Sequence, residues 1–163
     1  MRNLVLLAAL LASTAAQPAW AHATIGGDPA RIGQPFTAHF NIPHGCAGQP
    51  TVEVIVQVPP GFLAVEPVQV EGWTATSKTG RYDEAHTLGE DVVAEGVTEV
   101  SWTGGSLPDG EHATFALEGV FATDLEPGPV YFPLVQVCPE GEAAWIDHDQ
   151  DADKPAPSVQ LER

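Results

Sequence analysis

His22 is the residue of this chain whose position offers the most chemistry. It follows Ala19-Trp20-Ala21, a small-x-small tripeptide of the kind that signal peptidase cleaves, and an apolar run precedes that tripeptide over residues 4–12. Cleavage after Ala21 would leave a free amine on His22. The amine and the ring Nδ1 of this one residue could then chelate a metal ion, and such nitrogen donors favour Cu(II). Cleavage after Ala16 or Ala23 also meets the small-residue rule, and either cut would abolish the chelate.

Other types of copper site lack the residues that they need. Met1 is the only methionine, so a thioether Cu(I) site has no ligands in the mature chain. A blue-copper centre needs a free cysteine thiolate, two histidines and usually an axial methionine. The amino-terminal motif with histidine at the third mature position is also absent, because Thr24 stands there. A Cu(II) site built on the amino-terminal histidine itself remains.

A third donor for such a site would be a carboxylate or a second histidine. Glu53 lies on a predicted strand, on the face opposite the neighbouring valines. The simpler interpretation of Glu53 is an ordinary solvent-facing strand residue, and the residues alone favour it. His39 and His44 are the rival donors. The remaining histidines are expected to be surface residues rather than ligands: His86, His112 and His148.

Size and charge limit the possible partners. The chain has 163 residues and a net charge of −16; because the leader holds Arg2 and no acidic residue, residues 22–163 would carry −17. Without residues 1–21 the chain is long enough for one domain with a core and too short for two ordinary ones. Such acidity makes nucleic acids and anionic membrane surfaces poor partners. No later segment approaches the roughly 20 apolar residues of a membrane span. We therefore expect a signal peptide over 1–21 and a periplasmic or secreted domain over 22–163.

The two cysteines, Cys46 and Cys138, are expected to form a disulfide, as is usual for two cysteines in an exported protein. The bond would close a loop of about 90 residues and contribute roughly 4–5 kcal/mol in the chain-entropy model. The alternative is a pair of thiolates that bind Cu(I) or Zn(II), which an oxidising compartment disfavours.

The mature sequence is typical of an all-β protein. Apolar and polar residues alternate over 36–42 and 52–58, the period of a strand with one buried face. Further strands are predicted over 65–75, 97–102, 113–121, 130–137, 143–146 and 158–161. Turns are predicted at Pro59-Pro60-Gly61, Thr103-Gly104-Gly105, Pro108-Asp109-Gly110 and Pro127-Gly128-Pro129. Short strands at regular spacing, 15 prolines and no evident helix predict a single antiparallel β-sandwich.

A series of motifs in this order resembles the YcnI-like copper-binding domain family, long classed as a domain of unknown function. The series begins with His22-Ala23-Thr24 and continues with His44-Gly45-Cys46-x-Gly48-x-Pro50-Thr51, Gly72-Trp73, Val100-Ser101-Trp102-x-Gly104-Gly105-x-Leu107-Pro108-Asp109-Gly110, Phe132-Pro133-x-x-Gln136-x-Cys138, Trp145 and Pro155-Ala156-Pro157-x-Val159-x-Leu161. The motifs span nearly the whole mature chain, so they are more specific together than any one alone.

The resemblance implies a cupredoxin-like or immunoglobulin-like sandwich that binds one Cu(II). The amine and imidazole of the mature amino-terminal histidine, here His22, would hold the metal. A strand glutamate, here Glu53, would supply an oxygen, and a tryptophan, here Trp145, would lie close to the metal. A tryptophan ring beside a cation can contribute roughly 0.5–2 kcal/mol. Trp73 and Trp102 are expected to be core residues.

The expected function is therefore non-catalytic: copper acquisition, buffering or delivery outside the cytoplasm, with a copper transporter or another periplasmic copper protein as a possible partner. One alternative is a copper-dependent oxidative enzyme of the polysaccharide monooxygenase type. That class also starts with a histidine on a β-sandwich but needs a second histidine, which His39, His44 or His112 would have to supply. Another alternative is a structural or adhesion sandwich that binds no metal.

Overall fold

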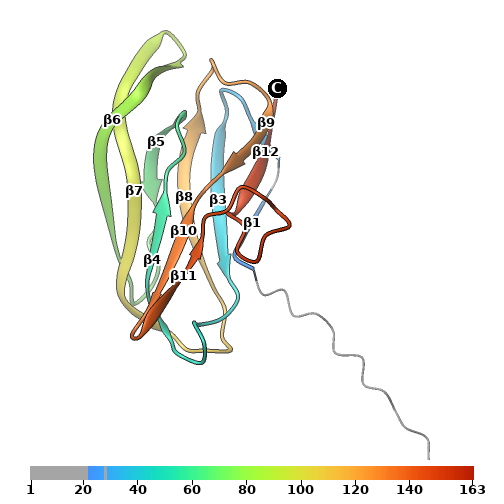
Figure 1. The fold of residues 1–163 in the computed structure, drawn as a ribbon. Coiled ribbons are helices and arrows are strands. Elements are labelled where there is room, and N and C mark those ends of the chain that lie inside the picture. Colours follow the sequence, from blue (N-terminus) through green and yellow to red (C-terminus); the bar gives the residue numbers. More distant parts are fainter. Residues whose placement is uncertain (1–21, 28) are drawn as a thin grey trace, which may run out of the picture.

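The computed structural model describes residues 22–27 and 29–163, so the predicted signal peptide lies outside the described part. Twelve strands make up the fold (Figure 1). They are β1 (Thr24–Gly26), β2 (Ala30–Arg31), β3 (Pro35–Ile42), β4 (Thr51–Gln57), β5 (Phe62–Pro67), β6 (Thr74–Leu88), β7 (Asp91–Leu107), β8 (Ala113–Phe121), β9 (Gly128–Tyr131), β10 (Leu134–Cys138), β11 (Gly141–Trp145) and β12 (Ser158–Glu162). Among these residues there is no helix long and apolar enough to cross a membrane.

Two antiparallel sheets form the sandwich. One has the order β1-β3-β8-β5 and the other the order β11-β10-β4-β7-β6, and a small third sheet joins β2, β12 and β9. Alternate residues of the strands are buried, and those from both large sheets join one hydrophobic cluster. The fold is therefore the predicted antiparallel β-sandwich. The strand β1 is at an edge of the first sheet and β11 at an edge of the second (Figure 1).

Aromatic side chains fill the core between the sheets. Phe62 packs against Phe121 and Phe132, with ring centroids 4.8 and 5.5 Å apart. Trp73 and Trp102 both pack on Phe115, at 5.0 and 5.3 Å, and both are buried. Trp73 and Trp102 are thus core residues, as expected.

The disulfide between Cys46 and Cys138 is present, with the two Cα atoms 6.1 Å apart. It links the loop before β4 to the end of β10 across 92 residues of sequence. The pairing predicted for an exported protein is confirmed, and the described chain has no free cysteine.

Three strand predictions were wrong in their bounds, namely those over 65–75, 97–102 and 130–137. The segment 65–75 is the end of β5, a turn and the start of β6, because Trp73 closes a turn back onto Val70. The segment 130–137 is two strands, since β9 pairs with β12 whereas β10 pairs with β4 and β11. Most of the long β6–β7 hairpin was missed. Its outer half carries mostly exposed residues on both faces, so no apolar alternation marks it.

The turn predicted at Thr103-Gly104-Gly105 lies inside β7 instead. The register between β4 and β7 shifts there, so that Thr51 faces Leu107 and Glu53 faces Thr103. Gly105 has a packing reason to be glycine, because a Cβ atom on it would lie 2.2 Å from the indole of Trp73. The glycines therefore allow an irregular strand to pass closely over a core tryptophan.

Substitution Gly105→Ala is expected to lower the free energy of unfolding by about 1–3 kcal/mol, the usual cost of forcing an extra group into a packed core. Gly80→Ala is the matched control, since Gly80 also lies in this hairpin and its added Cβ would meet only the Thr98 side chain, with the methyl at 3.3 Å and the hydroxyl at 3.6 Å. Urea unfolding of both variants measures the difference. Equal stability of the two variants would contradict the close packing of Trp73 on Gly105.

Candidate metal centre

Trp145 ends β11 with its side chain toward the inside of the sandwich. It pairs across the sheet with Leu134, and both side chains are buried. The indole is only 4% exposed, and its N–H donates to Oε1 of Gln136 at 3.2 Å. The position of the ring is therefore fixed by packing on one side and by a hydrogen bond on the other.

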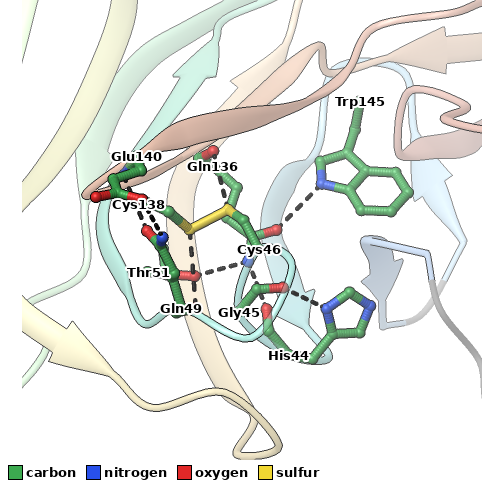
Figure 2. Close-up of a disulfide and its surroundings, with 9 residues drawn as sticks. All are labelled: His44, Gly45, Cys46, Gln49, Thr51, Gln136, Cys138, Glu140 and Trp145. Atoms are coloured by element: carbon green, nitrogen blue, oxygen red, sulfur yellow. Dashed lines mark hydrogen bonds between the residues drawn. A yellow bond between two sulfur atoms is a disulfide. The ribbon is translucent and has the colours of Figure 1, made fainter.

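Gln136 lies on β10 at the centre of a polar network inside the sheet (Figure 2). Its side chain is fully buried, and its amide nitrogen donates to the Thr51 hydroxyl at 2.6 Å and to the backbone carbonyl of His44. Its amide oxygen accepts from Trp145. Because a buried polar group without a partner costs roughly 1–3 kcal/mol, this one side chain holds three segments together.

The disulfide supports this network from both sides. Cys138 follows Gln136 by two residues on the same face of β10, and Cys46 follows His44 by two residues in the loop. Gln49 adds further links, since its side chain bonds both the backbone N–H and the carboxylate of Glu140. The loop that carries His44 is thus attached to β10 covalently and by hydrogen bonds (Figure 2).

His22 lies two residues before β1 and is exposed to solvent, and its imidazole contacts Trp145 edge to face. The ring centroids are 5.8 Å apart and the ring planes meet at 67°. A cavity of about 470 Å³ opens beside His22. It is lined by residues 22–26 on one side and by Gln150 and residues 155–158 on the other. The structure therefore brings together two of the predicted site residues, His22 and Trp145, through a direct contact between their rings.

Glu53 does not lie with these two residues. It pairs with Val137 on one side and Thr103 on the other, so its half-buried side chain points to the outer face of the five-stranded sheet. Trp145 and Gln136 occupy the inner face of that sheet, in register with Leu134 and Ala143. The sequence correctly placed Glu53 opposite the valines. Trp145, which His22 contacts, lies on the opposite face of this sheet from Glu53.

The other histidines are distributed over the molecule. His39 is exposed on β3 opposite Gly26, and His112 and His148 are exposed as expected. His86 corrects the prediction, because it is buried and lies 3.3 Å from a carboxylate oxygen of Asp124. A hydrogen bond from the Thr87 backbone, followed by the proximity of His86, lowers the pKa of Asp124. Over the described residues, no three His, Cys, Asp or Glu side chains gather as a metal site would require.

Gln136 is the residue that sequence reasoning missed as part of this site. The available signal was its place between Leu134 and Cys138 in an alternating buried column, where a polar side chain needs partners. Which partners it has could be read only from the fold, since Thr51 and His44 lie 85 and 92 residues away in sequence.

Fold and site together define an immunoglobulin-like β-sandwich with one disulfide and a histidine–tryptophan pair at its edge. The family model described as "Domain of unknown function (DUF1775)" matches residues 22–161. The chain belongs to this family, which confirms the resemblance drawn from the motifs.

A solved structure supports the fold assignment. It is an uncharacterised protein from Nocardia farcinica, whose crystal structure is described as an immunoglobulin-like fold. The likeness covers 87% of this chain and 99% of that chain, with a TM-score of 0.65 and 22% sequence identity. At that identity the likeness establishes the fold alone. No curated protein matches this chain.

Substitution Gln136→Glu tests the network at constant side-chain shape. The introduced carboxyl is buried without a cation, so its pKa rises above the unfolded value of about 4.3. The variant is then closest to wild-type stability near pH 4 and loses stability as the pH rises through the raised pKa, by about 1–3 kcal/mol more at pH 7. Urea unfolding at both pH values measures this difference against the wild type.

Gln160→Glu is the control for that experiment, because Gln160 is exposed on β12. Its stability relative to wild type is expected to change by less than about 0.5 kcal/mol at either pH. A Gln136→Glu variant that behaves like this control would show that the buried amide does not hold the three segments.

Proposed function

We propose that this protein is an exported, non-catalytic copper-binding protein, in which the amine and imidazole of a mature amino-terminal His22 chelate one Cu(II) beside Trp145. The observation that carries the proposal is the contact between the exposed His22 ring and the buried Trp145 ring. The amine depends on cleavage after Ala21, in a segment outside the described residues.

The donor chemistry of the site agrees with copper. An amine and an imidazole are nitrogen ligands of the kind that Cu(II) prefers, and both belong to one residue at the protein surface. The cavity beside His22 leaves room for a ligand or for solvent at the metal. The Trp145 ring would cover one side of the ion and exclude water there, and a cation beside such a ring is stabilised by roughly 0.5–2 kcal/mol.

Membership of the family adds a second line of support. The match begins at His22, the residue that the expected cleavage would make the first of the mature chain. The motif resemblance to YcnI-like domains implies the same metal and the same terminal residue. An exposed site with few protein donors exchanges its metal readily, so copper buffering or delivery to a transporter or another periplasmic protein is the role that we assign.

Removal of the chelate is the direct test of this proposal. Mature protein, with its first residue verified by intact mass, is titrated with Cu(II) against a chromophoric competing chelator. Two altered forms are compared: His22→Ala, and a form with one glycine added before His22. Removing a residue that only hydrogen-bonds to a metal ligand typically lowers affinity roughly 10- to 100-fold. Both forms lose part of the chelate itself, so each is expected to lose more affinity than that. Binding to wild type should also quench tryptophan fluorescence, because the ion would lie beside Trp145.

Two matched variants are expected to bind copper as the wild type does. His39→Ala removes an exposed histidine of β3, and Glu53→Gln removes the carboxylate on the outer face of the sheet. Unchanged affinity in His22→Ala, or a mature chain that starts at Thr24, would refute the proposed function. Weakened binding in Glu53→Gln would instead restore that carboxylate to the ligand set.

The proposed ligands also predict how affinity depends on pH. Copper must displace protons from an amine and an imidazole, groups that ordinarily titrate between about pH 6 and 8. Protonation therefore competes with the metal, and affinity is expected to fall as the pH drops below about 6. Copper titrations at pH 5 and pH 7.5 measure the change, and equal affinities would exclude this pair of donors.

A further inference from the structure

We infer that His44 supplies a second imidazole to the copper ion, through its Nε2 atom. This inference rests on the proposed function, since it adds a donor to the same His22 site. It replaces the carboxylate of Glu53, which lies on the other face of the sheet, by a nitrogen from the loop that the disulfide anchors.

Strand register brings His44 next to His22. In the β1–β3 pair Thr24 faces Asn41 and Gly26 faces His39. The last printed pair is Thr24 with Asn41, and the same register extended by two residues would set His22 opposite Pro43, the neighbour of His44. His39 is four positions away along β3, or about 13 Å at the usual rise of about 3.3 Å per residue. Of the two rival histidines, the register therefore favours His44.

The polar network independently ties both histidines to Trp145. The His22 ring contacts the indole, and Gln136 bonds both the indole N–H and the His44 carbonyl. Figure 2 shows the His44 imidazole and the Trp145 indole on the same side of the disulfide. The His44 loop and the chain terminus therefore meet around one tryptophan.

The hydrogen bond of the His44 ring leaves its Nε2 atom available to a metal. Its Nδ1 lies 2.5 Å from the carbonyl oxygen of Gly45, and a carbonyl can only accept a hydrogen bond. Nδ1 must therefore carry the proton, which leaves the lone pair of neutral imidazole on Nε2. Metal-binding histidines are typically held in this way, with the second ring nitrogen donating to a carbonyl or carboxylate.

The burial of His44 is suited to the same role. The residue is half-buried, and Cys46, which follows it closely, is held to Cys138. Gly45 between them leaves no room for a side chain, because a Cβ there would lie 1.9 Å from the backbone oxygen of Gln49. The loop thus holds the imidazole in a fixed orientation, whereas the exposed His39 has no such support.

The test counts imidazoles bound to Cu(II) in the mature protein. Pulsed EPR of the copper-loaded wild type, which detects the remote nitrogen of each coordinated imidazole, is expected to show two coordinated rings, and His44→Ala one. The copper affinity of His44→Ala is expected to fall by at least roughly 10- to 100-fold, which is the loss typical when a residue that hydrogen-bonds to a metal ligand is removed. The control His39→Ala should retain two rings and full affinity.

His44→Ala should remain folded, because Gln136 bonds the backbone carbonyl of His44 and not its side chain. Urea unfolding checks this. In the metal-free protein, ¹⁵N-resolved NMR of the histidine rings should also report the Nδ1–H tautomer for His44, independently of copper. One coordinated ring in both wild type and His44→Ala would overturn this inference while the His22 chelate stands. If both His22→Ala and the glycine-extended form bind copper as tightly as the wild type, the proposed function itself is refuted.

Discussion

The amide of Gln136 is the interaction on which the geometry of the site depends. One buried side chain joins the strand that carries Thr51, the loop that carries His44 and the indole of Trp145. These three segments are far apart in sequence, and a hydrophobic core alone would not fix their relative rotation, because apolar contacts have no direction. A buried amide with both ends bonded has a direction, and each lost partner would cost roughly 1–3 kcal/mol.

The disulfide acts on the same segments in a different way. By joining Cys46 to Cys138 it limits the unfolded chain, whereas Gln136 selects one arrangement within the folded chain. The two devices lie two residues apart on β10, so the loop of His44 cannot leave the sheet without disturbing both. The sandwich edge near β11 is therefore stiff, although an edge strand forms hydrogen bonds on one side only.

How much of this could be predicted from sequence depends on whether the signal is local. The strands β3 and β4 were found because their buried residues alternate with more exposed ones. The disulfide followed from there being only two cysteines. The outer half of the β6–β7 hairpin was missed because it has no buried face, and β9 was merged with β10 because Phe132-Pro133 continues the apolar run where the partner strand changes. Glu53 shows the same limit: alternation gives the face of a strand, but not which segment of chain covers that face.

The proposed site combines residues held by the sheet with the exposed His22, and this has a consequence for metal exchange. The indole and the His44 loop are held by bonds that exist before any metal arrives, so little of the binding energy is needed to organise them. His22, by contrast, is exposed and stands before the first strand, with its ring contact to Trp145 as its link to the sheet edge. If the metal is bound as proposed, movement of His22 alone would remove the chelate without any rearrangement of the core and leave the His44 imidazole as the remaining protein ligand. A partner protein could then displace the two nitrogen donors of His22 first and a single imidazole afterwards, which is an arrangement that delivery requires and permanent storage does not.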